Sequence, residues 1–157
     1  MISLGETTSM VKVPPPIWTL LCVLAAAALS ALAGWPRFPG LPIVPLGVVL
    51  VTAGVALPLW AGALFWRAGA TLIPQATDHK RLVVDGPYRF TRNPMYLGLT
   101  LVTLGIAVSN GAWPMLLSPI AVVVTFNLVH IPYEEAAMRR EFGADFDDYA
   151  RRVRRWI

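Results

Sequence analysis

Long apolar runs separated by short polar segments dominate the amino-acid sequence. Charged residues are absent from three intervals, which lie between Lys12 and Arg37, between Arg37 and Arg67, and between Arg92 and Glu134. Each interval has room for about 20 apolar residues, the length of helix that crosses a hydrocarbon core about 30 Å thick. The longest interval is interrupted by "NGAWP", so it is expected to hold two helices joined by a tight, uncharged link. The pattern therefore predicts an all-α integral membrane protein with about four transmembrane helices, at residues 17–34, 43–66, 94–109 and 113–133.

A different pattern follows the last predicted span. In residues 134–157, apolar side chains recur at i, i+4, i+7 and i+11, with arginine and aspartate on the opposite side. These apolar positions are Phe142, Phe146, Tyr149 and Val153. A single apolar stripe is typical of a helix that lies against a surface. The pattern predicts a cytoplasmic amphipathic helical tail, which Gly143 is expected to divide into two pieces.

The composition supports a membrane protein and argues against several other classes of protein. Of the 157 residues, 56% are hydrophobic and 14% are charged, whereas about 25% of residues are charged in a soluble domain. The length predicts a single domain over residues 1–157. The lone cysteine, Cys22, lies in an apolar run, so a disulfide framework is excluded. The sequence shows neither a metal-ligand spacing nor a glycine-rich phosphate loop.

Basic residues are distributed unevenly between the two ends of the predicted helices. If both termini are cytoplasmic, that side holds Lys12, five Lys and Arg residues of segment 67–92, and six arginines of the tail. The other side holds only Arg37. An excess of positive charge is typical of the cytoplasmic flanks of membrane helices, and anionic lipid headgroups attract it. The net charge of +4 therefore needs no nucleic acid as a partner.

Charged residues border both ends of the interval between Arg92 and Glu134. If the two predicted helices form a hairpin, Arg92 lies near Glu134 and Glu135 at one membrane depth. Charges at such a boundary are costly unless they are paired or used. One interpretation is a structural ion pair. The other is a pocket for a zwitterion, in which the arginine binds a carboxylate and a glutamate binds an ammonium group.

The start of the third predicted helix carries further candidate ligand groups. Pro94 suits the first turn of a helix, and the free N–H groups of that turn attract anions. Gly98 allows a ligand or another helix to approach closely. Tyr88 and Tyr96 are placed to cover an aromatic ring or a cation.

Other polar residues have plainer interpretations. His130 lies four residues before Glu134, where it is either hydrogen-bonded between helices or part of the cavity lining. His79 and Lys80 are expected to be solvated loop residues. Four arginines of the tail are expected to form a basic patch that faces the lipid: Arg151, Arg152, Arg154 and Arg155.

Two stretches are similar to one known family. "LVVDGPYRFTRNPMYLG" at residues 82–98 is followed by "IPYEEAAMRREFGADFDDYARRVRRWI" at residues 131–157. Together they resemble the isoprenylcysteine carboxyl methyltransferase and phospholipid methyltransferase superfamily, and in particular its small bacterial members. The resemblance covers residues 69–157. It implies a few membrane helices with an S-adenosylmethionine site on the cytoplasmic side, and a bacterial inner membrane as the location.

The resemblance also implies roles for single residues. Glu134 and Glu135 match the Glu-Glu pair of the family, of which one contacts the amino group of the cofactor's methionine part. Many relatives have histidine where this chain has Asn93, so an amide replaces an imidazole that can carry a proton. Arg92, Asn93 and Glu134 are the candidates for catalysis. The residues expected at the cofactor are Tyr88, Arg92, Asn93, Pro94, Tyr96, Gly98, His130, Glu134 and Glu135.

These observations together predict a membrane methyltransferase. The expected reaction transfers a methyl group from S-adenosylmethionine to a lipid or amphiphilic acceptor at the cytoplasmic membrane face. The acceptor is an isoprenylcysteine-type carboxylate, a phospholipid amine or a thiol. The alternatives are a small membrane transporter or a lipid-binding scaffold without catalysis. A transporter is expected to hold an ionisable residue deep in a span, and His130 is the candidate for that role.

Single cysteines introduced at Arg37, Asn110 and Lys80, in a chain whose Cys22 is replaced by serine, test the predicted orientation. In intact cells, a thiol reagent that does not cross the membrane is expected to label Arg37→Cys and Asn110→Cys. Lys80→Cys is expected to react only after the membrane is opened, because the arginine asymmetry assigns its segment to the cytoplasm. Labelling of Lys80→Cys in intact cells would reverse the orientation.

Overall fold

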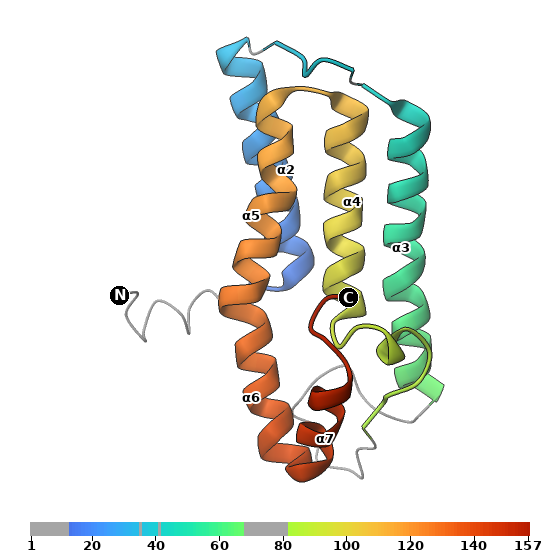
Figure 1. The fold of residues 1–157 in the computed structure, drawn as a ribbon. Coiled ribbons are helices and arrows are strands. Elements are labelled where there is room, and N and C mark those ends of the chain that lie inside the picture. Colours follow the sequence, from blue (N-terminus) through green and yellow to red (C-terminus); the bar gives the residue numbers. More distant parts are fainter. Residues whose placement is uncertain (1–12, 35, 41, 68–81) are drawn as a thin grey trace.

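The long helices of the protein lie side by side in one bundle (Figure 1). The computed structural model describes residues 13–34, 36–40, 42–67 and 82–157. Within these residues the protein is helical and has no β-sheet, which confirms the predicted all-α class. The first helices in chain order are α2 (Pro15–Ala33), α3 (Val44–Arg67), α4 (Pro94–Asn110) and α5 (Leu117–Thr125).

Three helical segments are long and apolar enough to cross a membrane. They are Pro15–Ala33, Val44–Arg67 and Trp113–Phe142. α4 is also apolar but has only 17 residues, which makes it about 26 Å long. This agrees with the short third span expected at residues 94–109. The integral membrane architecture is confirmed, with three helices of full length and one shorter one among the described residues.

The last predicted span is part of a longer helical run. That run consists of the 3-10 helix η2 (Trp113–Leu116), α5, the π-helical turn η3 (Phe126–His130) and α6 (Ile131–Phe142). Pro132 lacks the N–H that an α-helical bond needs. A wider turn precedes it, in which the Ile131 N–H donates to the Phe126 carbonyl. The helix therefore continues past residue 133, where the span was expected to end, and reaches the glutamate pair without a break.

Helices α3 and α4 approach each other to near backbone contact through glycines. A Cβ added at Gly54 would lie 2.7 Å from the Gly98 carbonyl oxygen, and one added at Gly105 would lie 2.7 Å from the Gly47 carbonyl oxygen. Pro58 of α3 packs its ring where a Cβ of Gly98 would stand, at 2.4 Å. Small residues permit such close packing of membrane helices. The contact fixes the start of α4 relative to α3.

The far end of the bundle is closed by contacts between its two connecting links. The Phe38 N–H donates to the Gly111 carbonyl at 2.8 Å, and the Phe38 ring meets the Trp113 ring with centroids 4.3 Å apart. Gly111, at φ +79°, ends α4 and starts the tight link to η2. α4 and α5 lie next to each other beyond this link (Figure 1), as the uncharged "NGAWP" predicts.

The tail folds back toward the start of α4. Gly143, at φ +52°, ends α6 and separates it from α7 (Ala144–Arg152), as expected. Phe146 and Tyr149 of the predicted stripe are buried. Val153 is extended and no longer helical. The C-terminus therefore lies beside the start of α4 (Figure 1), at the end of the bundle that holds the charged residues.

Gly54→Ala is expected to destabilise the protein, because the new methyl group would lie within 3 Å of the backbone of α4. Overpacking of this kind costs about 1–3 kcal/mol. Gly62→Ala is the matched control on the same helix, since a Cβ there meets nothing within 4 Å and alanine favours helix by about 1 kcal/mol. Thermal unfolding in detergent compares the two. Equal stability of both variants would contradict the close approach of α3 and α4.

Candidate functional site

The segment that leads into α4 is held by a buried tyrosine pair. The 3-10 helix η1 (Gly86–Arg89) carries Tyr88, whose ring lies edge-on to Phe65 with centroids 5.5 Å apart. The Tyr149 hydroxyl donates to the Tyr88 carbonyl at 2.7 Å. Burial raises the pKa of Tyr88 and raises the pKa of Tyr149 to about 12. Both phenols therefore stay neutral, and Tyr88 supports the loop from its inner side.

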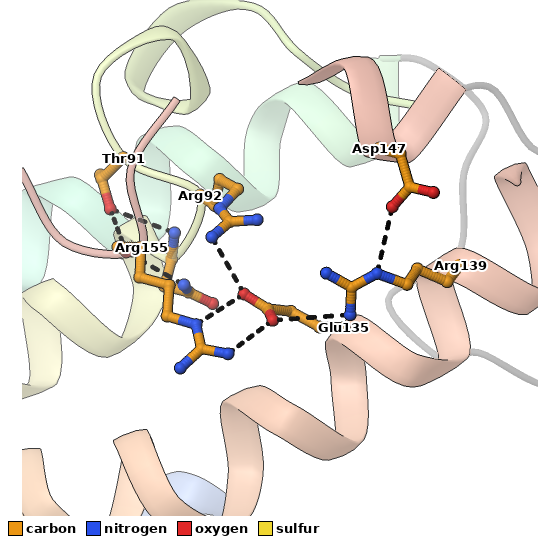
Figure 2. Close-up of polar contacts among 7 residues, drawn as sticks. Thr91, Arg92, Glu135, Arg139, Asp147 and Arg155 are labelled. Carbon is orange, nitrogen blue, oxygen red and sulfur yellow. Dashed lines mark hydrogen bonds and ion pairs between the residues drawn. The ribbon is translucent and has the colours of Figure 1, made fainter. Parts of the chain in front are cut away.

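Glu135 is the centre of the charged cluster, and three guanidinium groups converge on it (Figure 2). Arg155 binds it with two parallel hydrogen bonds, from Nε to Oε1 at 2.8 Å and from Nη2 to Oε2 at 2.7 Å. Arg92 Nη2 lies 3.2 Å from Oε1, and Arg139 Nη1 lies 3.8 Å from Oε2. The Glu135 side chain is only 7% exposed. A carboxylate so deeply buried depends on its charged partners.

The last residues of the chain bind the segment that precedes α4. The Arg92 N–H donates to the Arg154 carbonyl at 2.9 Å. The Arg155 carbonyl accepts two bonds, from Thr91 Oγ1 at 2.9 Å and from Asn93 Nδ2 at 3.0 Å. Asn93 is buried, and this bond fixes the orientation of its amide. Arg155 therefore joins α6 to the start of α4 with both its side chain and its backbone.

Glu134 has a different environment from its neighbour. The Tyr96 hydroxyl donates to Glu134 Oε1 at 2.5 Å, which links α4 to α6. Tyr96 is only 4% exposed, whereas Glu134 is exposed. No ion pair to Glu134 is formed by the described residues. One carboxylate of the pair is thus enclosed by arginines, and the other is open on one side.

His130 lies in the π-helical turn and packs against aromatic rings. It is buried, and its ring lies edge-on to Phe126 at 5.5 Å and 6.2 Å from the ring of Tyr96. Its imidazole makes no hydrogen bond with the described residues. The interhelical hydrogen bond that was one of the two expectations is therefore absent from this part of the chain. The position next to Tyr96 is compatible with the other, a lining role.

The structure brings most of the predicted residues to one end of the bundle. Arg92 and Glu135 form an ion pair, Tyr96 binds Glu134, and Asn93 lies between Arg92 and the helix start at Pro94. Gly98 faces α3, and the groups that approach it are the Pro58 ring and the Gly54 carbonyl oxygen. Its expected contact with the cofactor stays a prediction. His79 and Lys80 lie outside the described residues.

One expectation for the tail was wrong. Arg155 was assigned to a basic patch facing the lipid, but it binds Glu135 and is half-buried. Arg151, Arg152 and Arg154 are exposed, in keeping with such a patch. Thr91 was also missed. The helical pattern of the tail did not indicate the contacts of Arg155 and Thr91. Val153 leaves the helix, and the residues after it turn back toward α4.

Comparison with known proteins places the chain in a family. The profile described as phospholipid methyltransferase matches residues 43–145, which include α3, α4 and the Glu134–Glu135 pair. The chain belongs to the phospholipid methyltransferase family. This confirms the resemblance inferred from the two motifs, and it extends the family region upstream into α3.

Two curated relatives carry the name of the other branch of the superfamily. Protein-S-isoprenylcysteine O-methyltransferase B of Arabidopsis thaliana is 32% identical over 127 residues, which is 74% of this chain and 61% of the relative. Protein-S-isoprenylcysteine O-methyltransferase A of the same plant is 30% identical over 127 residues, with the same coverage. The chain thus spans about three-fifths of the length of these relatives. No solved structure matches it significantly.

Proposed function

We propose that this protein transfers a methyl group from S-adenosylmethionine to a lipid or amphiphilic acceptor at the cytoplasmic face of the membrane. The observation that carries the proposal is the pair of opposite charges across the start of α4. Arg92 is paired with Glu135 just before α4, and Glu134 is bound to Tyr96 in the first turn of α4. S-adenosylmethionine is itself a zwitterion, with a carboxylate and an ammonium group on its amino-acid part. Family membership supports the same activity.

Arg92 is the group best suited to the cofactor's carboxylate. Its Nε is buried and has no hydrogen-bond acceptor among the described residues. An unpaired buried donor costs about 1–3 kcal/mol, so a carboxylate that accepts from it would be favoured. The helical bonds of α4 begin with the Leu97 N–H donating to the Asn93 carbonyl. The N–H groups of Met95 and Tyr96 precede that bond, and helix starts of this kind favour anions.

Glu134 is the better of the two carboxylates for the ammonium group. Both oxygens of Glu135 already meet guanidinium groups, from Arg155, Arg92 and Arg139. Among the described residues, the Glu134 side chain has one hydrogen bond, from Tyr96. A cation therefore gains more from Glu134 than from a carboxylate that three positive charges surround. In this proposal Glu135 organises the arginines, and Glu134 meets the ligand.

The proposed methyl transfer needs little acid or base catalysis from side chains. Bound S-adenosylmethionine would supply a methyl group on a positively charged sulfur. After the transfer, this sulfur would be part of a neutral thioether, a leaving group that needs no proton. The protein then has to hold the acceptor in line, which contributes up to about 7–11 kcal/mol in favourable cases. Asn93 cannot act as a proton carrier, since it is an amide whose Nδ2 is bound to the Arg155 carbonyl. Glu134 is the carboxylate placed to accept a proton if the acceptor arrives protonated.

The acceptor in this proposal is a molecule that the membrane delivers. The charged cluster lies at one end of a bundle of apolar helices, where a lipid chain can remain in hydrocarbon while its polar end reaches the site. The family profile names phospholipids and the relatives' names refer to isoprenylcysteine. A lipid-borne carboxylate, amine or thiol is the acceptor class that fits these names together.

Two measurements test the proposed function. Calorimetric titration of the purified protein with S-adenosylmethionine is expected to show saturable binding. Membranes that contain the protein are then incubated with cofactor labelled in its methyl group, once with extracted lipids and once with the soluble cytosolic fraction. Label is expected in the lipid phase. Absence of binding would contradict the methyltransferase assignment, and label confined to water-soluble products would contradict the lipid acceptor.

Glu134→Gln is expected to weaken the binding of S-adenosylmethionine about 10- to 100-fold, the effect of losing a hydrogen bond to a charged group. The unfolding temperature is expected to change little, because Glu134 has no ion pair among the described residues. Asp145→Asn, which neutralises an exposed carboxylate at the start of α7, is the control. Wild-type affinity in Glu134→Gln would remove this residue from the site.

A further inference from the structure

The last five residues, Val153–Ile157, follow the end of α7, and we call them the C-terminal strap. It leaves α7 at Val153, with φ −119° and ψ 133°, and runs back to the start of α4. Two of its carbonyl groups, those of Arg154 and Arg155, accept the hydrogen bonds from the Thr91–Asn93 segment. Trp156 packs against the apolar cluster that contains Tyr96. The strap is therefore attached both to the segment that contains Arg92 and to the apolar cluster that contains Tyr96.

From these contacts we infer that the C-terminal strap is part of the methyl-transfer site and that Arg155 is its positioning residue. The inference rests on the proposed function, in which Arg92 binds the cofactor's carboxylate. Arg155 contacts both motifs of that site. Its guanidinium binds Glu135 of α6, and its carbonyl binds Asn93 at the start of α4.

Arg155 controls how strongly Glu135 holds Arg92. The two parallel hydrogen bonds from Arg155 occupy both oxygens of Glu135, at 2.8 and 2.7 Å. Arg92 has a longer contact with Glu135, at 3.2 Å, and its buried Nε has no acceptor in the part of the chain that the structure describes. Bidentate pairing of this kind is the strongest that a guanidinium forms with a carboxylate. Without it, Glu135 would attract Arg92 more fully and withdraw it from a ligand.

The same residue also fixes the loop from its backbone side. Asn93 and Thr91 both donate to the Arg155 carbonyl, and Asn93 immediately precedes the first residue of α4. A shift of the strap would therefore move the amide of Asn93 and the guanidinium of Arg92 together. The Arg154 carbonyl also binds this loop, but the Arg154 side chain is exposed, so it is the side chain that distinguishes Arg155 from its neighbour.

Three variants of the full-length chain test the inference. Arg155→Ala removes both side-chain bonds, and Arg155→Lys keeps the charge but loses the bidentate geometry. Arg152→Ala is the control, because it removes an equal charge from an exposed position of α7 outside the strap. Each is titrated with S-adenosylmethionine, and its thermal unfolding is measured on the same sample. The titration gives the affinity and the fraction of competent protein separately.

Arg155→Ala is expected to weaken S-adenosylmethionine binding about 10-fold or more, with Arg155→Lys intermediate and Arg152→Ala equal to wild type. A purely structural role would instead lower the competent fraction and the unfolding temperature and leave the affinity of the remaining protein unchanged. That result, or equal affinity in Arg155→Ala and Arg152→Ala, would overturn the inference alone. If Arg155→Ala does not fold, Arg155→Lys decides by the same comparison. Failure of the wild type to bind would overturn the proposed function as well.

Discussion

A buried carboxylate surrounded by guanidinium groups is the interaction on which the rest of this site depends. Glu135 is 7% exposed at its side chain and meets arginines from α6 itself, from the segment before α4 and from the C-terminal strap. Each partner alone would be a charge at the edge of an apolar bundle, where unpaired charges are costly. Shared pairing makes their positions interdependent. It joins α6, the segment before α4 and the C-terminal strap into one polar centre.

The apolar part of the bundle brings these groups to a common place. Glycines at seven-residue spacing let the backbones of α3 and α4 approach closely, which fixes where α4 starts. The π-helical turn before Pro132 carries the last long helix past the proline, so that Glu134 and Glu135 reach the same end. Tyr96 then connects α4 to Glu134. The packing of the helices therefore determines the geometry of the polar centre.

Much of this arrangement could be predicted from the sequence, because it follows from local patterns. Apolar runs predict the helices, the uncharged link predicts the neighbouring α4 and α5, and the resulting proximity predicts the pairing of Arg92 with the glutamates. The role of Arg155 could not be predicted in this way. It depends on a reversal at Gly143 and an extended Val153, which bring Arg155 to Asn93, 62 residues earlier. Helical periodicity assigned these residues to an exposed face, and no local pattern marks the return of the chain.

The most direct test of this account is the stability of Glu135→Ala compared with Asp148→Ala. Asp148 is an exposed carboxylate paired with Arg151 on α7, and such surface pairs contribute at most about 1 kcal/mol. Removing one partner of a buried ion pair costs about 3–5 kcal/mol. Equilibrium unfolding in detergent is therefore predicted to show a large loss of stability for Glu135→Ala and a small one for Asp148→Ala. Equal, small losses in both variants would contradict the claim that Glu135 holds the site together.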